Sequence, residues 1–199
     1  MTHDRTLTPR RIVRACRNLL WQVSVHAQMR RIEETDPYLR KIRAIHALMR
    51  IPSDYSNRGL TLQCQSTDLV KLSPTLKIDK KALAAFTAMQ ISAQRDGIEL
   101  RIRWAYRSVD DQSYFLLDRL RWGYSIKELL TFIAAPGYSE HHTGRAIDLL
   151  LIDNSKPFEE TPAYQWLSAN AASFNFFMSY PQNNPQGIIF EPWHWLHKT

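Results

Sequence analysis

The chain has 199 residues, of which 44% are hydrophobic and 23% charged, so it has the composition of a globular protein and not of a disordered one. Its net charge of +7 lies entirely in residues 1–50, which hold eleven Lys and Arg against four Asp and Glu. This basic segment suits an anionic surface, although a solvated helix face is the simpler explanation, and no nucleic-acid partner is expected. No stretch reaches the roughly 18 consecutive apolar residues of a membrane span, so no transmembrane segment is predicted.

Residues 1–52 are predicted to form a basic helical extension. Apolar residues recur at helical spacing from Ile12 to Val23, and again from Leu39 to Met49 after an Asp-Pro pair that suits a helix start. Residues 52–59 are rich in turn-forming types and separate this extension from a catalytic domain predicted over residues 53–199.

The first thirty residues do not form a clear signal peptide. They are basic, but polar residues interrupt their only Arg-free stretch, which a signal peptide would need as an apolar core. Val25 and Ala27 match the pattern of a cleavage site, but a cleavage site without an apolar core does not make a signal peptide. The sequence taken alone therefore predicts a cytoplasmic protein.

The catalytic domain is predicted to be α+β, with helices packed on a mostly antiparallel sheet. In the strand over residues 98–106, Ile102 and Trp104 are expected on one face and Arg103 and Ala105 on the other. Helices are expected over residues 80–95, 110–122, 126–134 and 163–172, and strands over residues 61–64, 98–106, 144–152, 174–180 and 188–191.

Two imidazoles and a carboxylate are candidates for a metal site. His141 precedes the strand over residues 144–152, Asp148 lies within that strand, and His194 follows the last strand. Three such ligands with a fourth position open are typical of one catalytic Zn2+ ion. Glu191 remains as a base for a zinc-bound water, whose pKa falls to about 7. The spacing of His141 and Asp148 argues against a helical His-Glu-x-x-His site.

These motifs identify a family by resemblance. The pattern Ser139-x-His141-x-x-Gly144-x-Ala146-x-Asp148, followed by Glu191-x-x-His194, resembles the D-alanyl-D-alanine carboxypeptidases and dipeptidases of peptidase family M15, in particular the VanY-like branch. The segment Tyr106-Arg107-Ser108 with Gln112 matches a further family element. One departure is that Trp104 and Ala105 stand where the family often has Ser-Gly, so the substrate groove is expected to differ there.

The resemblance implies a role for each matching residue. His141, Asp148 and His194 would bind zinc, Glu191 would be the general base, Arg107 would stabilise the oxyanion, and Ser139 would hold the terminal carboxylate of the substrate. Gln112, Tyr106 and Trp193 are further substrate-binding candidates. His142 and His197 match no family position and are expected to be supporting hydrogen-bond donors or surface residues.

The expected activity is hydrolysis of the terminal D-Ala-D-Ala bond of peptidoglycan peptides. An L,D-carboxypeptidase, a D,D-dipeptidase or an endopeptidase acting on a wall cross-link would use the same site, and a zinc-bearing binding module without catalysis is the remaining alternative. Members of the family usually act outside the cytoplasmic membrane. The resemblance therefore implies the periplasm or the cell envelope, against the cytoplasmic location predicted from the sequence alone.

Overall fold

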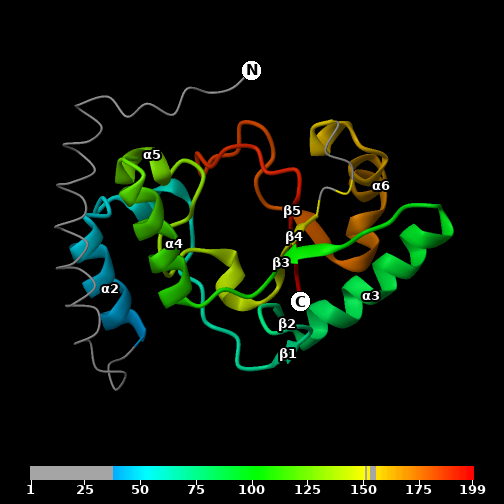
Figure 1. The fold of residues 1–199 in the computed structure, drawn as a ribbon, viewed down its shortest axis with the longest axis horizontal. Coiled ribbons are helices and arrows are strands. Elements are labelled where there is room, and N and C mark those ends of the chain that lie inside the picture. Colours follow the sequence, from blue (N-terminus) through cyan, green and yellow to red (C-terminus); the bar gives the residue numbers. More distant parts are fainter. Residues whose placement is uncertain (1–37, 151, 153–155) are drawn as a thin grey trace. The chain divides into compact units, whose positions relative to one another are not determined.

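A computed structural model describes residues 38–150, 152 and 156–199 (Figure 1). The helix predicted from Ile12 to Val23 lies outside these residues. The chain divides into two compact units, one made of Met1–Asn57 and Val109–Pro136 and the other of Arg58–Ser108 and Gly137–Thr199. The predicted domain boundary at residues 52–53 stays a prediction, since the contacts also group a later segment with the first unit.

The first unit is helical in its described part. It contains α2 (Tyr38–Met49), α4 (Val109–Arg121) and the short α5 (Ile126–Leu129), with η1 (Tyr55–Arg58) at its edge. One face of α2 buries Ile42, Ile45 and Met49, so the helix predicted from Leu39 to Met49 is confirmed. The helix predicted over residues 126–134 is shorter than expected, because the chain continues after α5 in tight turns.

The second unit begins with a hairpin and a long helix. Strands β1 (Leu69–Lys71) and β2 (Lys77–Asp79) pair antiparallel, and α3 (Lys80–Arg95) follows directly. The side chain of Asp79 caps α3 by accepting from the backbone N–H groups of Lys81 and Ala82. The helix ends before Gly97, which has a φ of 75°. The predicted helix over residues 80–95 is confirmed.

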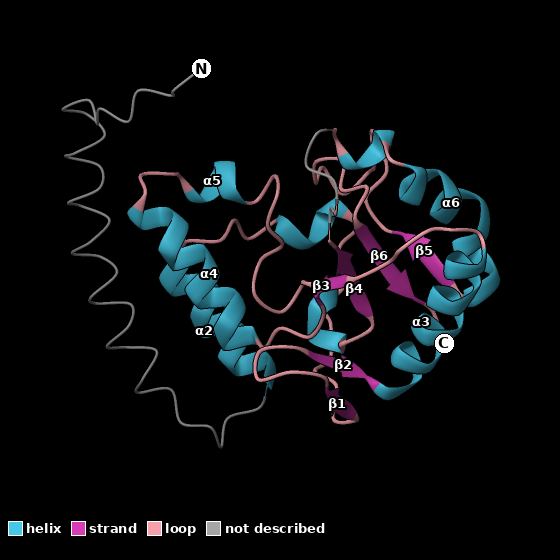
Figure 2. Cartoon of the chain, turned by 45° about the vertical axis from the view of Figure 1, so that its right-hand side comes forward, coloured by secondary structure: helices cyan, strands magenta, loops and turns pink. Residues whose placement is uncertain are grey.

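Four short antiparallel strands form the main sheet in the order β3-β4-β6-β5 (Figure 2). They are β3 (Ile102–Trp104), β4 (Ala146–Leu149), β6 (His194–His197) and β5 (Phe176–Met178). Helices α3 and α6 (Pro162–Asn170) lie on the same side of this sheet (Figure 2), where Ile147, Phe176 and Trp195 join the core. Short 3-10 segments complete the unit, namely η2 (Glu140–Thr143), η3 (Phe158–Glu160) and η4 (Ala171–Phe174). The predicted α+β class with a mostly antiparallel sheet is therefore confirmed.

The prediction for the strand over residues 98–106 was wrong in its length and in the faces of its side chains. The strand over residues 98–106 shrinks to β3, and its pairing with β4 shifts register between Ile102 and Trp104. The extra residue in β3 reverses the alternation of side chains. Consequently Trp104 is 46% exposed and Ala105 only 2%, the opposite of the predicted faces.

The apolar run over residues 188–191 is not a strand. It lies in a loop in which the side chain of Asn184 bonds to the backbone N–H and C=O groups of Ile188. A turn at Pro192 then leads into β6, which begins at His194. No strand forms over residues 61–64 either, although the backbone N–H of Gln63 donates to the carbonyl oxygen of Gly137. Among the described residues, no helix has the length and apolar character required to cross a bilayer.

Candidate metal centre

The register of two neighbouring strands places Asp148 beside His194. Asp148 of β4 and His194 of β6 are direct cross-strand partners, so both side chains project from the same face of the sheet. That face is opposite the one that packs on α3 and α6, because Ile147 and Trp195 occupy the alternate positions. His141 approaches from η2, the 3-10 turn that precedes β4.

These three residues bring their ligand atoms together. One nitrogen of His141, one of His194 and one carboxylate oxygen of Asp148 all lie within 4.8 Å of one another. Asp148 Oδ1 is 2.8 Å from His194 Nδ1, and Asp148 Oδ2 is 3.3 Å from His141 Nε2. The two imidazole rings meet edge to face with centroids 4.9 Å apart. The structure thus gathers the three predicted ligands from segments that are far apart in the sequence.

Each imidazole has its other nitrogen engaged by an oxygen atom. His141 Nδ1 lies 2.6 Å from the carbonyl oxygen of Ala105, to which it can only donate. His194 Nε2 lies 2.9 Å from Glu140 Oε2. These partners leave Nε2 of His141 and Nδ1 of His194 directed at Asp148, where a shared ion would sit.

The histidines and carboxylates of the centre shift one another's pKa values toward the charged forms. Burial alone would lower the pKa of His194, but its hydrogen bonds to Asp148 and Glu140 raise this pKa well above the usual value. Burial likewise opposes ionisation of Asp148, yet His141 and His194 hold its pKa far below the usual range. Burial also opposes ionisation of Glu140, but hydrogen bonds from His194 and Ser179 and the charges of both histidines together lower its pKa. The hydrogen bonds to these two carboxylates therefore favour the protonated form of His194.

Glu191 stands beside this cluster without joining it. Its Oε2 is 4.0 Å from His194 Nδ1, and its side chain is 14% exposed. Burial raises the pKa of Glu191 to about 7, and the neighbouring carboxylates of Asp148 and Glu140 also act in this direction. A carboxyl group whose pKa lies near neutrality can both accept and return a proton, as a general base must.

The backbone hydrogen bonds of Arg107 tie it to the loop that carries His141. Its N–H donates to the carbonyl oxygen of His141 at 3.1 Å, and its own carbonyl oxygen accepts from Nδ1 of His142 at 2.7 Å. His142 is fully buried, and its Nε2 accepts from the N–H of Gly137. The charge of Arg107 also lowers the pKa of Glu191. His142 is thus a supporting donor, one of the two roles expected for it.

The predicted substrate-binding residues lie in different surroundings. Ser139 precedes η2 and is 4% exposed. The hydroxyl of Tyr106 accepts a hydrogen bond from Gln65, and Trp193 is partly buried against the core. Gln112 belongs to the first unit, where its Nε2 donates to the carbonyl oxygen of Ala134 at 2.6 Å. Their roles toward substrate stay predictions.

Sequence reasoning missed Glu140. Its position between Ser139 and His141 was visible, but nothing in the spacing indicated that its carboxylate would turn toward a histidine 54 residues away. Its Oε2 also accepts from the hydroxyl of Ser179 at 2.6 Å. A polar cavity of about 210 Å3, lined among others by Glu140, Ser179 and Tyr180, adjoins this carboxylate.

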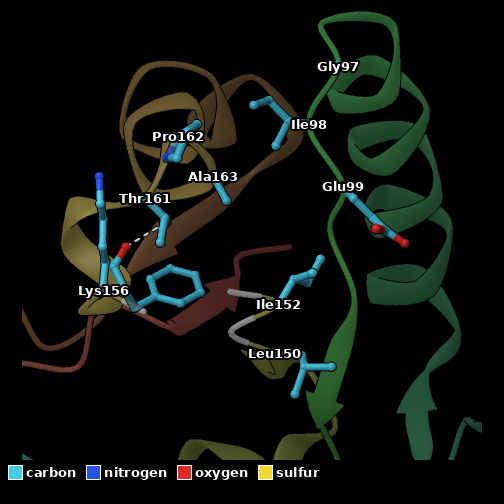
Figure 3. A pocket seen from close by; sticks show the side chains of 10 residues that line it. Gly97, Ile98, Glu99, Leu150, Ile152, Lys156, Thr161, Pro162 and Ala163 are labelled. Atoms are coloured by element: carbon cyan, nitrogen blue, oxygen red, sulfur yellow. Dashed lines mark hydrogen bonds between the residues drawn. The ribbon is translucent and has the colours of Figure 1, made fainter. Parts of the chain in front are cut away.

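A larger, mainly apolar cavity of about 400 Å3 opens elsewhere in the second unit (Figure 3). It lies between the turn after α3, the residues after β4 and the start of α6, and its described lining includes no residue of the metal cluster. Thr161 stabilises its wall, because its hydroxyl donates to the carbonyl oxygen of Phe158 at 2.6 Å (Figure 3).

The donor set fits zinc. Two imidazole nitrogens and one carboxylate oxygen make the three-ligand set of catalytic zinc sites, and both histidines are held by partners at their other nitrogen. His141 and His194 are at most 5% exposed, so their ring positions are fixed by packing. The three residues could therefore hold a zinc ion beside Glu191.

Two curated proteins are similar to this chain in sequence. The protein YodJ of Bacillus subtilis (strain 168) is 33% identical over 152 residues, which cover 72% of this chain and 55% of YodJ. A D-alanyl-D-alanine carboxypeptidase of Enterococcus faecalis (strain ATCC 700802 / V583) is 28% identical over 142 residues, covering 65% of this chain and 52% of that enzyme. The chain thus spans about half the length of these curated relatives.

Two solved structures and one family model are also similar to this chain. The LdcB LD-carboxypeptidase is similar with a TM-score of 0.60 and 27% identity, over 67% of this chain and 69% of that one. VanYB in complex with D-alanine-D-alanine is similar with a TM-score of 0.56 and 27% identity, over 74% and 80%. The VanY family, described as D-alanyl-D-alanine carboxypeptidase, matches residues 75–198. The chain therefore belongs to the VanY family.

Proposed function

We propose that this chain is a D-alanyl-D-alanine carboxypeptidase that binds one Zn2+ ion and releases the terminal D-alanine of peptidoglycan peptides. One observation carries the proposal, which is that Glu191, with a pKa raised to about 7, stands 4.0 Å from a buried cluster of two imidazoles and a carboxylate. Family membership supports the choice of substrate.

His141, Asp148 and His194 would hold the zinc. When bound, zinc supplies a Lewis acid that polarises a carbonyl and makes water a better nucleophile at neutral pH. Glu191 takes a proton from the attacking water while the oxygen of that water bonds to the scissile carbonyl carbon. Glu191 then gives the proton to the amine of the departing D-alanine as the C–N bond breaks, so the base is regenerated.

Arg107 supplies positive charge on the side of Glu191. Its charge lowers the pKa of Glu191, and its backbone is fixed by His141 and His142. A guanidinium held in this way suits the oxyanion that develops on the carbonyl oxygen, a contribution typically of about 3–4 kcal/mol. Ser139, Tyr106 and Trp193 are proposed to bind the rest of the terminal dipeptide.

An L,D-carboxypeptidase is the second candidate. The similarity to the LdcB LD-carboxypeptidase, at 27% identity and a TM-score of 0.60, favours it specifically. Both reactions use the same base and the same ligands, and they differ in the configuration of the residue before the scissile bond. Only the substrate can separate them.

The test offers the zinc-loaded protein two muropeptides, one ending in D-Ala-D-Ala and one ending in a single D-Ala, and follows the products by mass spectrometry. Loss of one alanine from the first alone establishes the D,D activity, and loss from the second alone establishes the L,D activity. The Glu191→Gln variant keeps the shape of the side chain and is expected to lose at least about 100-fold in kcat while still binding zinc. Glu99→Gln serves as the control, because Glu99 pairs with Arg101 on an exposed surface. Cleavage of neither peptide by the zinc-bound protein would refute both candidates.

This substrate would place the protein at the cell envelope. The net positive charge of residues 1–50 supports contact with an anionic surface there, since its attraction is electrostatic. Co-sedimentation of the full chain with anionic vesicles should therefore weaken as salt is raised from about 0.05 to about 0.5 M, where screening is strong. Binding that does not change with salt would refute this contact.

A further inference from the structure

Glu140 is a buried carboxylate that has no part in the reaction described above. It lies in η2 directly before His141, and its side chain is 16% exposed. Its Oε2 accepts two hydrogen bonds, from His194 Nε2 at 2.9 Å and from the hydroxyl of Ser179 at 2.6 Å. Burying a carboxylate costs free energy unless its hydrogen-bond partners compensate, so these two hydrogen bonds indicate that Glu140 has a specific role in the site.

The two ring nitrogens of His194 face different carboxylates. Nδ1 faces Asp148 Oδ1 at 2.8 Å, on the side of the metal cluster, whereas Nε2 faces Glu140. A carboxylate accepts hydrogen bonds only, so Nε2 carries the proton in this pair. When a metal ion displaces the proton that Nδ1 shares with Asp148, Glu140 keeps the other proton on Nε2 and the lone pair of Nδ1 becomes available to the ion.

His141 shows the same arrangement with a weaker partner. Its Nδ1 donates to the carbonyl oxygen of Ala105, and its Nε2 faces Asp148. A carbonyl carries no net charge, whereas Glu140 is a carboxylate and so makes the imidazole of His194 a more basic ligand. Of the two histidines, His194 therefore depends more on its supporting partner.

We propose that Glu140 is a positioning residue that fixes the ring orientation and the protonated nitrogen of His194, and that Ser179 in turn fixes Glu140. This inference rests on the proposed function, because it requires that the cluster binds zinc. Glu140 acts through His194 and does not ligate the ion itself, since it contacts the ring nitrogen opposite the one that faces Asp148.

The test is a graded series of variants whose zinc affinity is measured by competition with a chelator. Glu140→Ala removes both the acceptor and the charge, and we expect the affinity to fall about 10- to 100-fold. Glu140→Gln keeps an acceptor oxygen and should lose less, and Ser179→Ala less again. Glu99→Gln, at an exposed ion pair, should bind zinc as the original chain does.

Two further measurements separate positioning from a merely structural role. Circular dichroism of each zinc-free variant reports whether it is folded, and nuclear magnetic resonance of the zinc-loaded protein reports the Nε2–H signal of His194. We expect this signal to be sharp in the original chain and broadened by exchange in Glu140→Ala. If that variant does not fold, Glu140→Gln provides the same comparison.

The outcomes distinguish this inference from the proposed function. Folded Glu140 variants that bind zinc within about 2-fold of the original chain would overturn the inference and leave the carboxypeptidase intact. An original chain that binds zinc but cleaves neither muropeptide would overturn the function alone. An original chain that binds no zinc would overturn both.

Discussion

Gly144 allows the metal loop to lie close to the β1–β2 hairpin. Its φ is +67°, and a Cβ built on it would lie 2.7 Å from Leu69 Cδ2 and 3.0 Å from the backbone nitrogen of Asp79. The methyl group of Leu69 can move aside, but that nitrogen is held because it donates to the carbonyl oxygen of Gly144 at 2.9 Å. A side chain at this position therefore meets both an unfavourable backbone angle and a fixed neighbour.

We expect Gly144→Ala to destabilise the second unit by about 2–4 kcal/mol, of which about 1–2 kcal/mol comes from the left-handed backbone and the rest from the crowding. Gly97→Ala is the matched control, because Gly97 has a φ of +75° and a Cβ added to it would meet nothing within 4 Å. That control should cost only the backbone contribution of about 1–2 kcal/mol.

Amide hydrogen exchange of β4 and β6, read by mass spectrometry, reports the opening of this unit. Since about 1.4 kcal/mol is tenfold in an equilibrium constant, protection should fall roughly 30- to 700-fold in Gly144→Ala and roughly 5- to 30-fold in Gly97→Ala. Equal losses in the two variants would refute the reasoning, because they would show that the contact with Asp79 contributes nothing.

Three further results are expected. His142→Ala leaves the N–H of Gly137 and the carbonyl of Arg107 without their buried partner, so urea unfolding should show a loss of about 2–6 kcal/mol; an unchanged midpoint would contradict this. Arg58→Ala removes two hydrogen bonds to carbonyl oxygens of the loop before Glu191, so muropeptide kinetics should show a lower kcat at unchanged zinc affinity; an unchanged kcat would exclude this support. The raised pKa of His194 means that zinc must displace a proton near pH 7, so calorimetry in two buffers should show proton release and an affinity that rises with pH; a pH-independent affinity would refute it.

The cluster of three candidate ligands could be predicted because its residue types and order are specific. His141, Asp148 and His194 could be proposed without knowledge of strand pairing, and α3 could be predicted from its clear apolar period. The burial of β4 likewise followed from an apolar run that only Asp148 interrupts.

The features that could not be predicted depend on hydrogen bonds and strand pairing that the pattern of apolar residues does not show. The run over residues 188–191 has the composition of a strand, but Asn184 and Pro192 direct its backbone into a loop. The bulge in β3 depends on its register with β4, which local alternation does not encode. The role of Glu140 depends on a histidine from the other end of the domain, so no local pattern indicated it.

Strand β6 comes after all the other strands in the sequence, yet it lies between β4 and β5 in the sheet. During synthesis the ribosome therefore releases the central strand last, and β4 and β5 gain their shared neighbour only when the segment around His194 emerges. Until β6 joins the sheet, His194 does not lie beside His141 and Asp148. A metal ion held by all three residues would therefore require that β6 has joined the sheet.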